Sequence, residues 1–312
     1  MNTQLNLPIL DAKDLVECID NALKRNKLKD LERSEILFNP EENLSPLNGW
    51  SNDINVNVKH IKSEDRKHII AAVDSSAIFL ADTAEGSLYA SKCGISIAYD
   101  CKQITHFKIG PILFYLNENS ITLDYSMIKR MIRVRVERAL QKKLANTLDN
   151  AIILVDGSLK SSIFENDNSI PSILDDCKEY NNTLIGISKV SRLKLIEKLI
   201  SSFHKRDACY IDISSILRAY ISNLYGKQLL VKLSKDGLVL RADVINENDL
   251  SLLIRNDILH NGYPQTLRLA HHLSVFTRIE VIATISMISS KFKTSEIDSC
   301  NLRNVLLGKI GG

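Results

Sequence analysis

The sequence predicts an α/β protein in which helices flank a mixed sheet, and three observations lead to this prediction. Three strand-like segments follow one another between residues 68 and 116, and the middle one alternates in part, at Ile95, Ile97 and Tyr99. Helix-like and strand-like segments then alternate up to residue 202. The composition, 45% hydrophobic and 25% charged residues, is normal for a globular chain.

An N-terminal helix is predicted over residues 11–36, where apolar residues recur at helical spacing and lysines crowd the end. The apolar stripe consists of Leu15, Cys18, Ile19 and Leu23. Residues 37–67 are rich in Asn, Pro and Ser and are expected to form a long loop. We expect residues 1–67 to serve contacts with a second copy or a partner.

The core elements are expected in a fixed order. The strands cover residues 68–80, 87–99 and 103–116, the last with a break at Gly110-Pro111. The alternating elements that follow are a long helix over about 125–148, a strand at 152–155, a helix near 172–180, a strand at 184–187 and a helix at 191–202. Three strands followed by alternating helices and strands is the order of the ribonuclease H-like fold.

The C-terminal part reads as an extension of helices and a hairpin. The expected helices cover residues 214–224, 247–259 and 265–290, and the expected hairpin joins residues 227–233 to 238–244. We expect residues 68–290 to form the main domain and residues 291–312 a tail.

The bulk properties exclude several classes of protein. The six cysteines are scattered without a CxxC pair, which argues against a zinc site and a secreted disulfide scaffold. The net charge of +3 is too small to indicate a polyanionic partner, so a nucleic-acid surface needs local clustering. We see no leader, and the longest apolar runs, such as Val281–Ile288, are short for a membrane span. We expect a cytoplasmic protein without membrane contact.

Two strand-like runs each end in an aspartate that small residues follow. They are His68-Ile-Ile-Ala-Ala-Val-Asp74-Ser-Ser and Ala151-Ile-Ile-Leu-Val-Asp156-Gly-Ser. Each aspartate alone could simply cap a turn or a helix. Side by side at the edge of a sheet, the two carboxylates would bind Mg²⁺ or Mn²⁺, which prefer oxygen ligands.

Glu137 is the candidate third acid, because no other acid lies between Asp124 and Asp149. Helical spacing turns it partly toward the core, where a carboxylate needs a partner such as a metal. The alternative is a salt bridge to Arg133 or Arg138. The bases around it are Lys129, Arg130, Arg133, Arg135, Arg138, Lys142 and Lys143. From this helix Arg130, Arg133, Arg138 and Lys142 are candidate phosphate contacts; a solvated helix face is the alternative.

Three further residues are candidates on weaker signals. Lys189 follows a short strand in Gly186-Ile-Ser-Lys and could neutralise a phosphate, or simply lie in solvent. Tyr263 and His271 are eight residues apart across the start of a helix. An imidazole there could bind a metal or transfer a proton, although a single helical histidine is more often structural.

Five segments in this order resemble the NurA nuclease family of archaea and some bacteria, over about residues 68–290. They are Ala72-Val-Asp-Ser-Ser76, Leu154-Val-Asp-Gly-Ser-Leu159, Gly186-Ile-Ser-Lys189, Arg241-Ala-Asp243 and Gly262-Tyr-Pro264 to His271. This chain has Asp74-Ser75-Ser76 where Asp-Gly-Ser is common in the family, and Gln265-Thr266 where another Pro is frequent.

The resemblance implies a ribonuclease H-like core and a site in which Asp74, Glu137 and Asp156 are the acidic metal ligands. Tyr263 and His271 match the family's C-terminal active-site pair. It also implies Mn²⁺-dependent cleavage of DNA, with 5′-to-3′ exonuclease and single-strand endonuclease activity. The implied assembly is a ring-like homodimer with a HerA-type hexameric DNA translocase, acting in DNA end resection.

The sequence therefore predicts a two-metal nuclease acting on single- and double-stranded DNA, with Mn²⁺, or Mg²⁺, as cofactor. The predicted metal ligands are Asp74, Glu137, Asp156 and His271, and Lys189 and Tyr263 would position the phosphate. The alternatives are a Holliday-junction resolvase or ribonuclease H type nuclease, and a non-catalytic DNA-binding subunit of a translocase complex. Trp50, near Leu47, is either an interface anchor or part of this domain's own core.

Overall fold

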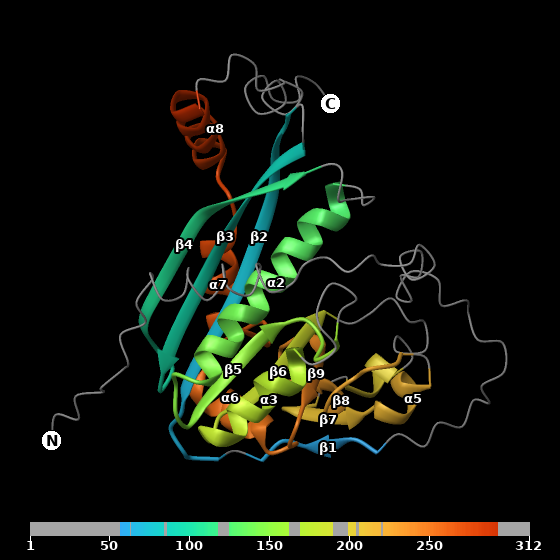
Figure 1. Ribbon diagram of the computed structural model, residues 1–312. Helices are drawn as coiled ribbons and strands as arrows, with labels where there is room; N and C mark the ends of the chain where they lie inside the picture. The colour runs from blue at the N-terminus through green and yellow to red at the C-terminus, as the bar shows by residue number, and fades with distance from the viewer. Residues whose placement is uncertain are drawn as a thin grey trace, which may run out of the picture.

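A computed structural model describes residues 57–292 except 63, 84–85, 118–124, 162–168, 190–198, 204–205 and 220 (Figure 1). Several predicted features lie outside the described residues. They are the helix over 11–36, most of the loop over 37–67 with Leu47 and Trp50, most of the helix over 191–202, and nearly all of the tail over 291–312.

A nine-stranded mixed sheet forms the centre of the fold, in the order β1-β7-β8-β9-β6-β5-β2-β3-β4. β2 and β5 are parallel, as are β5 and β6, and the remaining neighbours are antiparallel. The strands are β1 (Lys59–His60), β2 (Ile69–Thr83), β3 (Gly86–Tyr99), β4 (Lys102–Asn117), β5 (Ala151–Asp156), β6 (Thr183–Lys189), β7 (Cys209–Asp212), β8 (Lys227–Lys232) and β9 (Val239–Val244). The predicted α/β class with a mixed sheet is confirmed.

Helices cover both faces of this sheet (Figure 1). On one face, α2 (Tyr125–Ala145) and α3 (Ser169–Glu179) share an apolar core with residues such as Val73 and Val155. On the other face, α6 (Asp249–Asn256) and α7 (Gln265–Ser274) share a second core with residues such as Ala72 and Leu154. Because successive strand residues point to opposite faces, neighbours in the sequence serve different cores.

Smaller elements complete the structure. A 3₁₀ turn (Ser201–Phe203) and α5 (Ser214–Arg218) pack near β7 and β8. β10 (Leu259–His260) and β11 (Tyr263–Pro264) form a two-stranded hairpin directly before α7. α8 (Arg278–Phe292) packs Ile285 and Ile288 on the far ends of the long strands β2 and β3, away from the other helices (Figure 1).

The C-terminal extension differs from the prediction. The hairpin β8–β9 is part of the main sheet, because β9 pairs with β6 from Ile185↔Val244 to Lys189↔Leu240. The short strands β1 and β7 were not predicted, and the helix expected over 214–224 ends at Arg218. The expected break at Gly110-Pro111 is a register shift within a continuous β4.

The single helix expected over residues 265–290 is two helices, because the chain leaves the helical conformation between Ser274 and Arg278. This segment, Gln265–Ser290, has the length and hydropathy that a membrane-spanning helix needs. α7, however, buries Leu267 and Ala270 against the sheet. Composition and length are therefore weak grounds for a membrane span here.

Candidate active site

The parallel pairing of β2 and β5 brings Asp74 and Asp156 together, although only Asp156 ends its strand, because β2 continues to Thr83. β2 and β5 pair in register up to Val73↔Val155, so the next residue of each strand is one of the two aspartates. Both side chains point toward the face that α7 covers, the face of Ala72 and Leu154. Asp74 is 7% exposed, whereas Asp156 lies at the exposed end of β5.

α7 places His271 beside Asp74. His271 Nδ1 lies 2.7 Å from Asp74 Oδ2, and Ser274 Oγ donates a hydrogen bond to the same oxygen at 2.9 Å. Ligand atoms of Asp74, Asp156 and His271 all lie within 4.8 Å of one another. Two carboxylates and an imidazole at this spacing are a donor set that suits a divalent cation such as Mn²⁺.

Gly94 of β3 lets α7 approach this closely. Gly94 pairs with Asp74 in the sheet, and a Cβ added there would lie 2.2 Å from Ala270 O and 2.6 Å from Leu273 Cβ. Sequence reasoning missed Gly94 and Ser274. A glycine inside a buried strand, which often marks the close approach of another backbone, was the available signal for Gly94.

Tyr263 holds Asp156 from the hairpin in front of α7. Its hydroxyl donates a hydrogen bond to Asp156 Oδ1 at 3.2 Å. Burial, reinforced by the charge of Asp156, raises the pKa of Tyr263 above its usual range, so the hydroxyl remains a donor at neutral pH.

Buried Asp257 accepts the Thr266 N–H at 3.2 Å and so caps the first turn of α7.

A buried ion pair supports the turn that follows Asp156. Arg241 and Asp243 of β9 make two hydrogen bonds, of 2.8 and 2.9 Å, and Asp243 also accepts the Leu159 N–H at 2.9 Å. Gly186 of β6 leaves room for this turn, since a Cβ there would lie 2.6 Å from Gly157 O. The Arg-Ala-Asp segment singled out in the sequence therefore shapes the backbone beside Asp156.

Glu137 lies on the opposite face of the sheet from His271. It is 8% exposed on α2 and receives hydrogen bonds from Ser75 Oγ at 3.3 Å and from Gln141 Nε2 at 3.2 Å. Burial raises the pKa of Glu137 to about 8; the charges of Asp74 and Asp156 act in the same direction, and those of Arg138 and Arg133 oppose them. Glu137 is thus close enough to sense both aspartates but stands outside the three-residue donor set.

The predicted DNA-binding residues of α2 differ in their surroundings. Arg130 and Arg133 are exposed. Arg138 is half-buried and donates to Gln141 Oε1 at 2.7 Å, and Lys142 contacts Ser172 and Asp176 of α3. The backbone of Lys189 ends β6, but its side chain is outside what the structure describes.

Comparisons with known proteins cover the part of the chain that contains Asp74, Asp156 and His271. A sequence model of the NurA domain matches residues 68–276. The chain is similar in structure to the NurA nuclease from Sulfolobus solfataricus, with 16% identity and a TM-score of 0.51 over 94% of this chain and 98% of that one. It is also similar to a NurA bound to dAMP and manganese, with 11% identity and a TM-score of 0.50 over 80% and 92% of the two chains. These structural matches report a shared fold, and a search of curated proteins finds no match.

Proposed function

The chain belongs to the NurA family, and from this premise we propose that it is a DNA nuclease that works with Mn²⁺, or Mg²⁺ in its place. The observation that carries the proposal is the donor set of Asp74, Asp156 and His271, whose ligand atoms lie within 4.8 Å of one another. A NurA of the same fold binds manganese together with dAMP, a DNA mononucleotide, which supports both the metal and the substrate class.

When bound, the cation supplies positive charge that stabilises the attacking and leaving oxygens of a phosphodiester, and two such ions would act on opposite sides. The protein's part is to hold the ligands. Asp74 is oriented by two donors on one oxygen, and Asp156 by the Tyr263 hydroxyl. The His271 side chain is 60% exposed, so its ring is open to a bound ion and to solvent.

Glu137 is the proposed third acidic ligand. Its carboxylate is held by two neutral donors and is destabilised by burial and by the two aspartates. A cation at Asp74 and Asp156 would reverse that balance and favour the ionised form. Arg130 and Arg133, exposed on the same helix, would contact DNA phosphates, together with Arg138, Lys142 and Lys189.

The family membership extends the proposal to finer activities. We propose 5′-to-3′ exonuclease and single-strand endonuclease activity in DNA end resection in the cytoplasm. The proposed assembly is a homodimer that docks on a HerA-type hexameric translocase.

The nuclease proposal is tested with the purified chain on end-labelled single- and double-stranded DNA, with Mn²⁺, with Mg²⁺ and with excess EDTA. We expect cleavage of DNA that requires the cation, with products that shorten from the 5′ end. RNA–DNA hybrids and four-way junctions are the comparison substrates. Cleavage that persists in EDTA, or a clear preference for hybrids or junctions, would contradict the proposal.

The assembly is tested separately. Light scattering should give about twice the chain mass of 35.1 kDa. Co-elution with a HerA-type hexamer should follow on size exclusion. A strict monomer at micromolar concentration that does not co-elute would remove the ring and translocase part and leave the nuclease in place.

A further inference from the structure

A lysine is fully buried on the face of the sheet that carries Asp74. Lys92 is 1% exposed and lies on β3 opposite Ser76, two pairs along from Asp74 and Gly94. Because strand residues alternate, Lys92 and Ser76 share the face of Asp74. The register between β3 and β4 shifts at this point, between Ser91 and Cys93, which leaves Lys92 beside an irregularity that can redirect a side chain.

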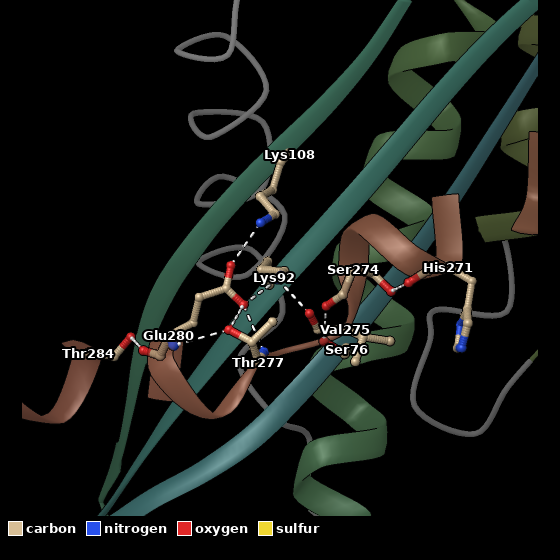
Figure 2. A network of polar contacts seen from close by, with 9 residues as sticks. All are labelled: Ser76, Lys92, Lys108, His271, Ser274, Val275, Thr277, Glu280 and Thr284. Atoms are coloured by element: carbon tan, nitrogen blue, oxygen red, sulfur yellow. Dashed lines mark hydrogen bonds and ion pairs between the residues drawn. The ribbon is translucent and has the colours of Figure 1, made fainter. Parts of the chain in front are cut away.

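The hydrogen bonds of Lys92 are made to the junction between α7 and α8. Its Nζ donates to Val275 O at 2.5 Å and to Glu280 Oε2 at 2.7 Å, and it lies 5.4 Å from the centre of the Phe276 ring. Figure 2 shows Lys92 bonded to Val275, in the short segment that joins the two helices, and to Glu280 of α8. A buried ammonium is tolerated only when it is paired in this way.

Glu280 is held on the α8 side of this contact. It accepts the Thr277 N–H at 2.8 Å while Thr277 Oγ1 accepts the Glu280 N–H at 3.2 Å, a reciprocal cap of the α8 N-terminus. Lys108 of β4 donates to the other carboxylate oxygen at 2.8 Å. The hydrogen bonds from Lys108 and Lys92 hold the pKa of Glu280 well below its usual range, so it is ionised at neutral pH.

The same row of residues caps the C-terminal end of α7. The last carbonyls of a helix have no partner inside the helix and carry partial negative charge. Ser76 Oγ donates to Ser274 O, and Lys92 donates to Val275 O (Figure 2). Ser274 is the residue that also binds Asp74, and His271 lies one turn before it.

We propose that Lys92 is a positioning residue of the metal site: by holding the end of α7 against β3, it fixes His271 and Ser274 at Asp74. This inference rests on the proposed metal-dependent function, because it assigns a role in ligand geometry. Gly94 removes the steric obstacle to α7, and Lys92 supplies the attraction that sets how far along the strand the helix lies.

Lys92→Met tests the proposal, since it keeps much of the volume and removes the donor. Mn²⁺ binding to the full-length chain is measured by electron paramagnetic resonance of the free ion, and kcat and KM are measured on single-stranded DNA. We expect the Kd for Mn²⁺ to rise about tenfold, at the lower end of the effect of residues that orient metal ligands. We expect kcat to fall with little change in KM for DNA.

Lys108→Met is the matched control. It removes a positive charge from the same Glu280, but Lys108 is 47% exposed and its ion pair is with α8 rather than with α7. We expect its Mn²⁺ affinity and kcat to stay within about twofold of the wild-type values. If Lys92 only stabilised the fold, Lys92→Met would lower the melting temperature and leave Mn²⁺ binding by the folded protein unchanged.

Equal Mn²⁺ affinity in the wild-type protein, Lys92→Met and Lys108→Met would overturn the proposal. If circular dichroism shows that Lys92→Met does not fold, Ser76→Ala tests the proposal instead. It removes the hydrogen bond that Ser76 Oγ donates to Ser274 O and leaves no charged group without a partner. Weaker Mn²⁺ binding by folded Ser76→Ala supports the proposal, and wild-type binding overturns it. A wild-type chain that binds Mn²⁺ but cleaves no DNA would remove the nuclease function, and the Mn²⁺ titration would still decide the role of Lys92.

Discussion

The two faces of the central sheet treat their carboxylates differently. On the α7 face, Asp74 and Asp156 are surrounded by donors from His271, Ser274 and Tyr263, and they lie within reach of one cation. On the α2 face, Glu137 is buried against two neutral donors and its pKa is raised to about 8. Asp74 and the adjacent Ser75 divide between these faces, because strand residues alternate.

This difference separates two ways of preparing a metal site. The α7 face holds its proposed ligands in place in the metal-free protein, at the cost of keeping two acids close together. On the α2 face, Glu137 is protonated over most of the neutral range, and a bound cation would favour its ionised form.

The largest expected effect breaks the α7 face. Asp74→Asn and Asp156→Asn keep the shape of the side chain and remove the ligand charge, so cleavage should fall by more than the roughly 10–100-fold typical of residues that merely support a ligand. DNA affinity and the melting temperature should stay close to the wild-type values. Full cleavage by either variant in Mn²⁺ would exclude that residue as an essential ligand.

Glu137→Gln measured in the same assay sharpens the comparison. A loss comparable to that of the aspartates means that both faces bind the metal. Activity near the wild-type level means that Glu137 only shapes the core and that the α7 face is sufficient.

The pH dependence of stability gives an intermediate effect. Folding raises the pKa of Glu137 from its ordinary 4.5 to about 8, mainly through burial, so the folded protein holds a proton that the unfolded chain releases. Stability is therefore lost as pH rises toward 8, by at most about 1.4 kcal/mol per pH unit. Asp249 and Asp257, whose pKa values burial raises to about 6, contribute mainly below that window.

Urea unfolding of the metal-free chain between about pH 6.5 and 8.5 measures this slope. The slope should shrink in Glu137→Gln. If Glu137 is a ligand, saturating Mn²⁺ should also remove this pH dependence of stability, because the metal displaces the proton from Glu137. An equal slope in both proteins would assign the pH dependence to other groups.

The smallest expected effect concerns the basic helix. If exposed Arg130 and Arg133 contact phosphates, each alanine variant should reduce the slope of log K against log salt by about one unit. Lys142 is already engaged with Ser172 and Asp176 of α3, so Lys142→Ala should change the slope less. Unchanged slopes for both arginines would make this a solvated helix face.

Local sequence patterns predicted the part of the site that depends on local structure. Asp74 and Asp156 each directly follow an apolar run of a strand, and the strand order places β2 and β5 side by side; that β2 continues past Asp74 was not predicted from this run. Helical spacing turned Glu137 toward the core, where it lies buried. Whether Glu137 and His271 bind a metal stays a prediction.

The remaining features depend on contacts between distant segments. The close approach of α7 depends on Gly94, which is 176 residues from Ala270 in the sequence, and a glycine in a strand does not tell which distant segment packs against it. β9 pairs with β6 across more than fifty residues of sequence, so the hairpin was predicted to lie in a C-terminal extension rather than in the main sheet. The break after Ser274 has neither Gly nor Pro, and the reciprocal cap of Thr277 and Glu280 was the one readable signal for a new helix.

The central claim is that Asp74 and Asp156 hold a divalent cation beside His271. Crystals of the protein soaked in Mn²⁺ test it most directly, through the anomalous scattering of manganese. The account predicts a peak within ligand distance, about 2.0–2.6 Å, of oxygens from both aspartates. No peak between them at saturating Mn²⁺, or a peak held by other residues alone, would contradict it.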